Sequence, residues 1–408
     1  MNFIKIFFLK EMKKTKNRLK LNLLINIANL LSRKSKKIVS KKVKYLDLAM
    51  LNRKVILPGI ITKIYLPNYT FTKNTAFIET YSPEVQLLEL ENYKISGSCS
   101  SFINDDDLFI ERYCNEDNEN AIYNSGSLLS HDNTLALILE DEVSHIEKGF
   151  FLIGNGSWNY YHWLVEILPK LQTYLSLNLY KQGVKLLVPY AVKDNENLKF
   201  LLDSMLGDIK VDMVFVSRNF SLHVNHLYHL TPINNILFNE RKIGLASKIL
   251  HLRYDSLAFI KLKIEQVINL NDNKIFSHDR IFLARKEDKL RSYNQSDIIS
   301  LLLKYKFKII YMEDHDIKQQ IFLFKNAKYI VGASGAAWSN LIFCNSSCRA
   351  LTWLPESAKN FPVFSTLANF ANVKLFFFNT ASSHYKDIHD NYIIDINIFK
   401  IKLEKLLK

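Results

Sequence analysis

The feature that most constrains the fold is a repeated alternation of strand-like and helix-like segments from residue 150 onward. The expected strands lie at 150–153, 185–188 and 211–216 in a first series, and at 280–284, 307–311 and 327–331 in a second. Strand–helix–strand units build parallel sheets, with helices on their faces. The chain is therefore expected to be an α/β protein with two Rossmann-type parallel-sheet domains that face each other.

The remaining segments fit around these two series. Residues 50–150 are rich in short β-type runs separated by polar turns, and helical periodicity covers 396–407 near the end of the chain. A chain of 408 residues exceeds the usual single domain, which agrees with a two-domain organisation.

The positive charge of the chain is concentrated at one end. Of the net charge of +14, residues 1–44 contribute +13, so the rest of the chain is close to neutral. Nucleic-acid enzymes usually carry basic residues along the cleft that binds the polymer. We therefore expect no nucleic-acid partner.

The same N-terminal arm has the pattern of a membrane-surface helix. Residues 19–31 place Asn22, Asn26 and Asn29 on one helical face and leucine or isoleucine on the others, between clusters of lysine and arginine. An apolar face with a basic rim favours an anionic membrane surface. The alternative is a solvated basic helix that packs on the body of the protein.

Targeting and redox signals indicate a cytoplasmic protein, peripheral at the inner face of the membrane. No stretch approaches 18 apolar residues, and residues 3–9 are too short and too interrupted for a signal-peptide core. The four cysteines show no disulfide framework, and Cys344 and Cys348 are expected to be buried thiols.

Two motifs, far apart in the chain, carry chemistry. In the first, at 159–171, His162 and Glu166 are four residues apart, which places both on one face of a helix. In the second, at 331–340, a strand runs into a turn of small residues and then a helix. Such a turn presents backbone N–H groups that suit a phosphate. An acid/base pair and a phosphate-binding turn on separate segments predict a cleft between two domains.

These segments resemble the glycosyltransferase 61 family, whose bacterial members are usually described as capsular polysaccharide biosynthesis proteins. The resemblance covers roughly residues 150 to 357. Its blocks are Asn-Tyr-Tyr-His-Trp-x-x-Glu-x-Leu-Pro from Asn159, then Arg285, Arg291 and Asn294, then Glu313, Gln320 and Ala327, and last the Gly-x-x-Gly-Ala turn with Asn340. Many members have histidine where this chain has Ser334, so no role of that histidine is carried over.

The resemblance implies a GT-B-like fold and an inverting transfer of a sugar from a nucleotide-sugar donor, UDP-linked, to a surface polysaccharide such as capsule or lipopolysaccharide, or to its lipid-linked precursor. His162 and Glu166 are the expected catalytic residues, and which of them takes the proton stays open. The expected donor and diphosphate contacts are Arg285, Arg291, Glu313, Ser334, Gly335, Ala336 and Asn340. No metal or other cofactor is expected, because arginines and a helix N-terminus can stabilise the leaving diphosphate.

With these roles, the chain divides into four parts. They are a basic amphipathic arm at 1–44, an N-terminal α/β domain at 45–240 with the His162 helix, a Rossmann-type nucleotide-sugar-binding domain at 241–375, and a tail helix at 376–408 that packs back.

Two rival functions belong to other classes. The sequence from Gly332 to Ala336 is close to the Gly-x-Ser-x-Gly nucleophile elbow, so a serine hydrolase with Ser334 as nucleophile is one alternative. The other is a catalytically degenerate, membrane-bound module that binds a nucleotide or a partner, because Ser334 replaces the histidine.

Two further signals suggest a metal, and both have a simpler interpretation. Asp105, Asp106 and Asp107 lie in an acidic stretch that is expected to be an exposed turn. His223, His226 and His229 recur every three residues, a spacing that converges on neither a helix nor a strand.

Overall fold

The computed structural model describes residues 37–45, 52–72, 75–110, 125–131, 134–236, 250–268, 277–286, 291–380 and 391–408. The first 36 residues of the expected arm, Cys114 and the expected domain boundary at 240 lie outside the described residues. Within the described part of the chain, no helix is long and apolar enough to cross a bilayer.

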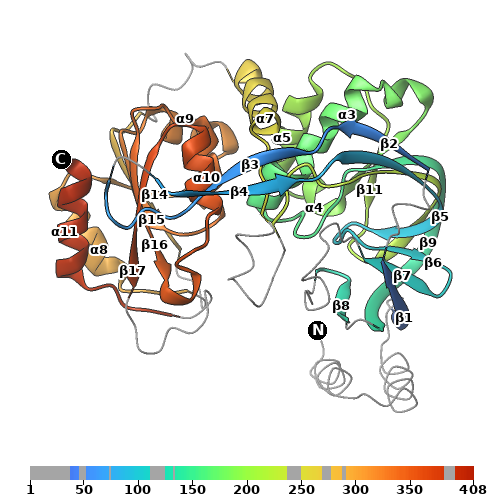
Figure 1. The fold of residues 1–408 in the computed structure, drawn as a ribbon, viewed down its shortest axis with the longest axis horizontal. Helices are drawn as coiled ribbons and strands as arrows, with labels where there is room; N and C mark the ends of the chain where they lie inside the picture. The colour runs from blue at the N-terminus through green and yellow to red at the C-terminus, as the bar shows by residue number, and fades with distance from the viewer. Residues whose placement is uncertain are drawn as a thin grey trace, which may run out of the picture.

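The N-terminal part is built on a ten-stranded mixed sheet (Figure 1). Its strands are β1 (Lys37–Tyr45), β2 (Asn52–Leu57), β5 (Val85–Ser96), β6 (Phe102–Asn104), β7 (Asp107–Ile110), β8 (Leu128–His131), β9 (Leu135–Phe151), β10 (Lys185–Pro189), β11 (Met213–Val216) and β12 (Phe220–Leu230). Strands β1, β7, β6, β5, β12 and β9 form a closed ring, because β1 pairs with β7 on one side and with β9 on the other. Alternate residues of β12, such as Phe220, Leu222 and Val224, are buried in the hydrophobic clusters that pack against this sheet.

This sheet corrects the expectation of a second Rossmann-type parallel sheet. Only β12, β9, β10 and β11 form a run of parallel neighbours, and most other pairs are antiparallel. Among the described residues between 37 and 151, no helix lies between the strands, and a parallel pair of consecutive strands needs such a crossover. The expected arm also ends earlier than residue 44, because β1 belongs to the ring.

Helices cover the β10–β11 side of this sheet. They are η3 (His162–Ile167), η4 (Leu168–Lys170), α3 (Leu171–Ser176), η5 (Leu179–Gln182), α4 (Tyr190–Lys193) and α5 (Glu196–Leu206). A longer helix, α7 (Tyr254–Val267), packs against α5 and η4 and also contacts η9 (Ala336–Phe343) of the C-terminal part.

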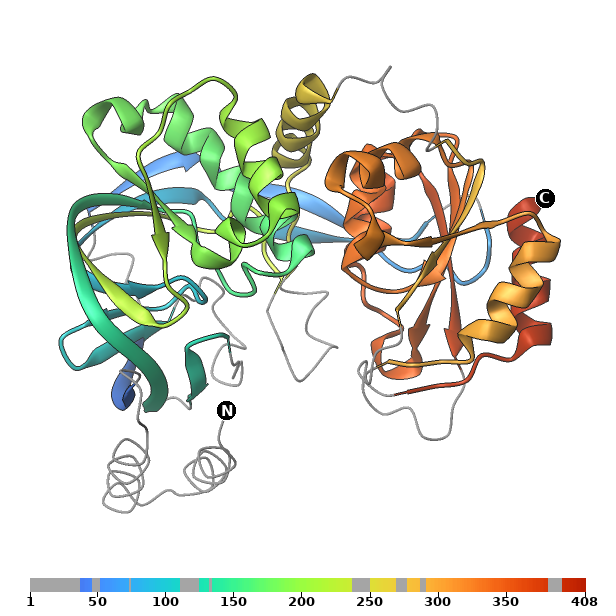
Figure 2. The ribbon, with the colours of Figure 1, turned by 180° about the vertical axis from the view of Figure 1, so that it is seen from behind.

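The C-terminal part is a parallel five-stranded sheet with helices on both faces, as expected for a Rossmann-type domain. The strand order is β14 (Lys308–Tyr311), β13 (Arg280–Ala284), β15 (Tyr329–Ala333), β16 (Arg349–Pro355) and β17 (Lys374–Thr380). The remaining helices are α8 (Gln295–Lys304), η8 (Met312–Asp314), α9 (Ile317–Asn326), η10 (Glu356–Ala358), α10 (Val363–Phe370) and α11 (Ile396–Leu407). Figures 1 and 2 show α9 and α10 on the side that faces the N-terminal part, and α8 and α11 on the outer side.

The strand order fixes where this sheet can bind a ligand. The first strand of the C-terminal part, β13, has β14 on one side and β15 on the other. The connection from β13 to β14 therefore runs in one direction along the sheet, and the connection from β14 to β15 runs in the other. In open α/β sheets, ligands bind outside the carboxyl ends of the strands at such a reversal. The residues that follow β13, β14 and β15 therefore meet at one edge.

A two-stranded ribbon of β3 (Ile60–Tyr65) and β4 (Phe77–Ser82) joins the two parts (Figure 1). The Tyr65 N–H donates to Thr366 Oγ1 of α10 at 3.0 Å, and Asn68 forms a parallel bridge beside β17. One hydrophobic core then runs from Trp163 of the N-terminal helices to Trp338 of η9. Residues 60–72, placed in the N-terminal domain by the sequence, thus pack on the C-terminal sheet.

Candidate functional site

The helix that carries His162 is irregular. It begins as a π-helical turn, η3, continues as the 3₁₀ turn η4 around Pro169, and becomes α-helical only at Leu171. The helix is interrupted at Pro169, which has no backbone N–H to donate to the preceding turn. Trp163 is fully buried and donates its Nε1–H to the Leu198 carbonyl at 3.1 Å, which confirms it as a core residue. π-turns inside helices are frequent at functional sites.

His162 and Glu166 form a close pair. His162 Nδ1 lies 2.5 Å from Glu166 Oε2, and the two side chains are only 12% and 13% exposed. The other carboxylate oxygen, Glu166 Oε1, accepts the Ile236 N–H at 2.8 Å. Since an ionised carboxylate can only accept, Nδ1 carries the hydrogen of the pair and Nε2 is the basic nitrogen. Both oxygens of Glu166 are therefore hydrogen-bonded: Oε2 holds the imidazole ring, and the bond from Ile236 to Oε1 fixes the carboxylate.

Tyr161 lies against this pair from the core side. Its ring stands edge-on to His162 with centroids 5.2 Å apart, and it is 6% exposed. Its hydroxyl is buried and has no hydrogen-bond partner among the residues the structure describes. Burial, and then the negative charge of Glu166, raise the pKa of Tyr161 well above its ordinary value. Tyr161 therefore stays protonated beside the carboxylate.

The second half of the site lies at the carboxyl edge of the parallel sheet. Arg285 follows β13, and its backbone N–H and carbonyl are both bonded by the side-chain amide of Gln295, each at 2.8 Å. The guanidinium Nη2 reaches across and donates to the Ser334 carbonyl, after β15. A Cβ added to Gly335 would lie 3.2 Å from the same Nη2. The structure thus brings together Arg285 and the Ser334–Gly335 turn, which the sequence analysis named as contacts of one diphosphate.

The turn leads into η9, which is a 3₁₀ helix and not the expected α-helix. Gly335 is extended, with φ 176°, and Ala336 is the first residue of η9. Trp338 fastens the turn: its backbone N–H donates to the Gly335 carbonyl at 3.0 Å and its Nε1–H to the Ala333 carbonyl at 2.9 Å. The strand–turn–helix arrangement predicted for a phosphate is therefore present around Ser334, Gly335 and Ala336.

Asn340 connects the two halves. It is fully buried, and its Oδ1 accepts the Tyr160 hydroxyl at 2.7 Å, while its Nδ2 donates to the Ala337 carbonyl at 3.2 Å. Tyr160 comes two residues before His162, so one hydrogen bond ties the helix of the acid/base pair to the helix behind the phosphate turn. Burial also raises the pKa of Tyr160 far above its ordinary value, which keeps the hydroxyl a donor.

Glu313 and Arg291 lie further from this centre. Glu313 is exposed in η8, directly after β14, next to Asp314, which pairs with Lys286. Arg291 has a left-handed backbone, with φ 62°. The charges of Arg285 and Arg291 both act on Tyr392, whose pKa is nevertheless raised because burial outweighs them. The two arginines therefore share one neighbourhood, whereas in the described part of the chain Glu313 makes no hydrogen bond or ion pair with Ser334 or Arg285.

Several contributors to the site carried no assigned role in the sequence. The Tyr160 hydroxyl, the Gln295 amide and the Ile236 N–H each fix a predicted residue from a distant segment. Tyr160 stands inside the motif around His162, and its spacing could have drawn attention to it. A backbone N–H at Ile236 has no sequence signal.

The structure gives no support to an elbow at Ser334. A nucleophile elbow holds its serine in a strained turn before a helix. Ser334 is not among the non-glycine residues with positive φ, and its carbonyl is bonded by Arg285. The acid and base expected for a hydrolase, Asp387, His384 and His389, lie outside the described residues.

The two apparent metal signals have ordinary explanations. Asp106 is 93% exposed at the turn between β6 and β7, and Lys44 pairs with Asp107 at 2.5 Å. On β12, His226 faces solvent near Glu147, while His229 is buried against Phe102. In the described part of the chain, no group of three or more His, Cys, Asp or Glu side chains is placed to hold a metal ion. Cys344 and Cys348 are buried free thiols, as expected.

The fold and the site define an α/β protein with a ligand-binding edge at a doubly wound parallel sheet, joined to a helix that carries a His–Glu pair. Residues 160–351 match the model of the family described as Glycosyltransferase 61. The match confirms the resemblance to glycosyltransferase family 61 over this segment, which is slightly less than half of the chain. The matched segment includes all nine residues predicted for the site.

One curated protein from Staphylococcus epidermidis is also similar. It bears the name "Putative epidermin response regulator" and is 26% identical to this chain over 183 residues. The similar region covers 42% of this chain and 85% of that protein.

Proposed function

We propose that the protein is an inverting glycosyltransferase that transfers a sugar from a nucleotide-sugar donor to a surface glycan or its lipid-linked precursor. The observation that carries the proposal is the His162–Glu166 pair, 2.5 Å apart, which the Tyr160–Asn340 hydrogen bond ties to the turn contacted by Arg285. The match to the glycosyltransferase 61 family favours sugar transfer as the chemistry of such a site.

In this mechanism, His162 is the base and Glu166 positions it. The acceptor hydroxyl gives its proton to His162 Nε2 while its oxygen attacks the anomeric carbon of the donor. The bond between that carbon and the diphosphate oxygen breaks, and its electron pair leaves with the nucleoside diphosphate. Glu166 holds Nδ1 and stabilises the imidazolium that forms, since both carboxylate oxygens are already committed.

The leaving diphosphate is stabilised at the edge of the parallel sheet. Arg285 supplies a fixed positive charge, and the backbone of the Ser334–Ala336 turn supplies N–H groups. Arg291 adds a second charge from the same neighbourhood. The ribose contact in this proposal is Glu313, which follows β14, and the proposed donor is UDP-linked. With these groups, the proposed reaction needs no metal ion.

The proposed acceptor lies at a membrane. The basic, amphipathic sequence of residues 1–36 suits an anionic surface such as the inner face of the cytoplasmic membrane. Residues of β1 are part of the folded ring and are excluded from this role.

Thermal unfolding of the full-length protein with UDP, GDP, CDP or dTDP, each with EDTA or Mg²⁺, tests the donor site. A ligand at about 100 times its Kd stabilises by roughly 2.7 kcal/mol. We expect one nucleotide to raise the Tm with EDTA present, and Arg285→Ala to abolish this shift. Arg53→Ala, at an exposed position of β2, is the matched control and should leave the shift unchanged.

The outcomes separate the candidate functions. No shift with any of the four nucleotides would contradict a nucleotide-sugar transferase. A shift without transfer from the corresponding nucleotide sugars to a membrane glycan fraction would favour the degenerate binding module. Labelling of Ser334 by a fluorophosphonate would support the alternative function of a serine hydrolase.

A further inference from the structure

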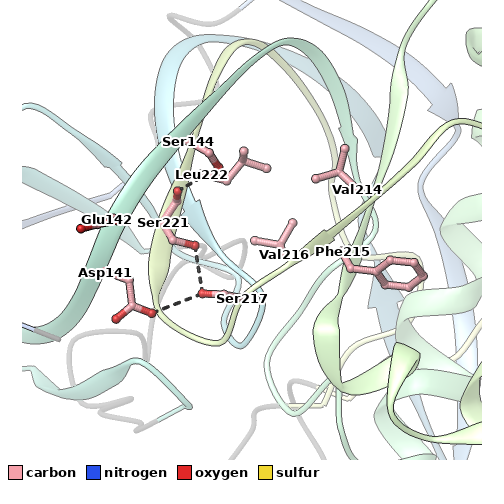
Figure 3. A pocket seen from close by; sticks show the side chains of 9 residues that line it. All are labelled: Asp141, Glu142, Ser144, Val214, Phe215, Val216, Ser217, Ser221 and Leu222. Atoms are coloured by element: carbon pink, nitrogen blue, oxygen red, sulfur yellow. Dashed lines mark hydrogen bonds between the residues drawn. The ribbon is translucent and has the colours of Figure 1, made fainter. Parts of the chain in front are cut away.

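A groove outside the site described above lies between β9, β11 and β12 (Figure 3). Its volume is about 320 Å³, within the range of pockets that hold small ligands. The lining residues are Asp141, Glu142, Ser144, Val214, Phe215, Val216, Ser217, Ser221 and Leu222. One wall is therefore polar, with carboxylates and hydroxyls, and the other is apolar.

The polar wall is held in a fixed arrangement. The buried Asn219 donates its Nδ2 to both oxygens of Asp141, each at 3.0 Å. Ser217 Oγ lies 3.5 Å from Asp141 Oδ2 and 3.0 Å from Ser221 Oγ. Neither Asp141 nor Glu142 has an ion pair with any residue that the structure describes. The groove therefore presents ordered hydrogen-bond acceptors and a negative charge without a balancing cation.

An exposed tryptophan, Trp158, lies beside Arg218, which follows the groove residue Ser217 in the chain. Trp158 is 42% exposed, whereas Trp163, Trp338 and Trp353 are at most 2% exposed. The guanidinium of Arg218, the residue after Ser217 of the groove, lies 6.0 Å from the centre of the Trp158 ring. Such an ordered, exposed ring offers a flat apolar surface.

A glycine fastens the segment of Trp158 to the groove. The Gly97 N–H donates to the Ser217 carbonyl at 2.7 Å, and the Gly97 carbonyl accepts the Ser157 hydroxyl at 3.2 Å. A Cβ at Gly97 would lie 2.2 Å from the Val216 carbonyl oxygen, so no larger residue fits without displacement of the backbone. Trp158 and the groove are therefore fixed relative to each other.

The same loop leads directly to the proposed base. Trp158 precedes His162 by four residues, so their Cα atoms are at most about 15 Å apart, since consecutive Cα atoms are 3.8 Å apart. A few linked sugar rings span this distance. This spacing allows a short saccharide to extend from Trp158 towards His162.

We propose that Trp158 and this groove form an acceptor subsite for a neutral, hydroxyl-rich saccharide. The C–H face of a sugar ring packs on Trp158, and its hydroxyls donate to Asp141 and exchange hydrogen bonds with Ser217 and Ser221. The carboxylates disfavour an anionic sugar at this position, by like-charge repulsion. The inference rests on the proposed function, since it names the acceptor class for the same reaction.

The exposure difference among the tryptophans supplies the test. Acrylamide quenching of the full-length protein reports mainly Trp158, because the other three tryptophans are buried. The probes are a panel of neutral oligosaccharides of glucose, galactose, mannose and N-acetylglucosamine, with oligogalacturonate as the anionic comparison. We expect at least one neutral member to protect Trp158 from quenching, and oligogalacturonate not to do so.

Variants connect the protection to the groove. Asp141→Asn should weaken the affinity for the protecting saccharide about tenfold, because the substitution removes the charge from a hydrogen-bond acceptor. Glu147→Gln, an exposed carboxylate further along β9, should leave its affinity unchanged. Trp158→Ala should raise the acceptor KM, whereas Phe77→Ala, an aromatic ring of similar exposure with Lys63 4.3 Å from its centre, should not.

The outcomes also separate this inference from the proposed function. If a nucleotide raises the Tm and no neutral saccharide protects Trp158, the acceptor subsite is refuted and the donor site stands. Protection that Asp141→Asn leaves unchanged, or stronger protection by oligogalacturonate, would also overturn the subsite. If neither a nucleotide nor a saccharide binds, the result contradicts the proposed function itself, on which the acceptor subsite rests.

Discussion

The two halves of the candidate site are built in different ways. The His162–Glu166 pair is largely buried, on a helix set into the main core, and a carboxylate with both oxygens bonded fixes its ring. Arg285 and the Ser334 turn lie at a sheet edge, partly exposed, and are held mainly through backbone atoms. The proposed base is therefore pre-organised by packing, whereas the proposed diphosphate contacts depend on loop geometry. Substitutions in the two halves should therefore change different properties of the protein.

The largest expected effect is the loss of the base. His162→Ala should reduce sugar transfer about 10²- to 10⁴-fold, the usual contribution of a general base, with the nucleotide-induced Tm shift retained. Initial rates with the nucleotide sugar selected by thermal shift measure it. His226→Ala is the matched control, because His226 pairs with Glu147 at 3.4 Å on the exposed surface of β12.

Glu166→Gln then distinguishes the two roles within the pair. A positioning Glu166 leaves part of the activity in the glutamine variant, since the amide oxygen can still accept from Nδ1. Equal losses in Glu166→Gln and His162→Ala, with an unchanged pH profile in the residual activity, would instead point to Glu166 as the proton acceptor.

The next effect concerns the connection between the halves. Tyr160→Phe removes the hydroxyl bonded to the buried Asn340 Oδ1, so the free energy of unfolding should fall by roughly 1–3 kcal/mol. Denaturant unfolding measures it. Tyr180→Phe removes a hydrogen bond at an exposed site, to Asn178, and should cost much less. Equal stabilities of the two variants would show that the Tyr160–Asn340 bond does not hold the halves together.

A smaller effect should appear in the diphosphate half alone. Gly335→Ala places a methyl group against Arg285 Nη2, and the guanidinium has to move by a few tenths of an ångström. We expect a nucleotide Kd several-fold weaker and a Tm close to that of the parent without nucleotide. Calorimetric titration with the selected nucleotide gives the Kd, and an unchanged value would separate the turn from the donor site.

The smallest effect is a pH dependence of stability far from either half. Burial, with the nearby charges of His145 and Lys94, lowers the pKa of His223 below its ordinary value of 6.5. The folded state then binds the proton less readily than the unfolded state. Stability should be complete above about pH 6.5 and decline as pH falls through the lower folded pKa.

His223→Gln should flatten this decline between pH 7.5 and 5.5, measured by urea unfolding. His226→Gln, at an exposed position of the same strand, serves as the comparison. A decline of the same size in all three proteins would assign it to other groups. The experiment also separates a pH profile of stability from the pH profile of activity expected of His162.

The sequence predicted the C-terminal part better than the N-terminal part for a physical reason. Strands β13, β14 and β15 alternate with helices and pair with near neighbours in the chain, so local periodicity determines them. The ring depends on β12 pairing with β5 and β9, and on β1 pairing with β9, across long separations. Alternation within a strand does not tell which distant strand it meets.

The same distinction applies to the site. Helical spacing predicted the His162–Glu166 contact, and the family resemblance named Arg285 and Ser334 as contacts of one ligand, which agrees with the hydrogen bond between them. The Ile236 N–H on Glu166 is a backbone contact, which no side-chain pattern encodes. The expected roles of Arg291 and Glu313 stay predictions. Lys289, within the expected basic loop, lies outside the described residues.

The ribbon of β3 and β4 restricts how this protein can change shape. The chain passes from the ring to the five-stranded sheet along β3, returns along β4, and passes again between α7 and β13. Two parts joined by one connection can rotate about it, whereas three connections spread over an interface restrict the parts to bending relative to each other. We therefore expect any movement that separates the two parts to bend the β3–β4 ribbon.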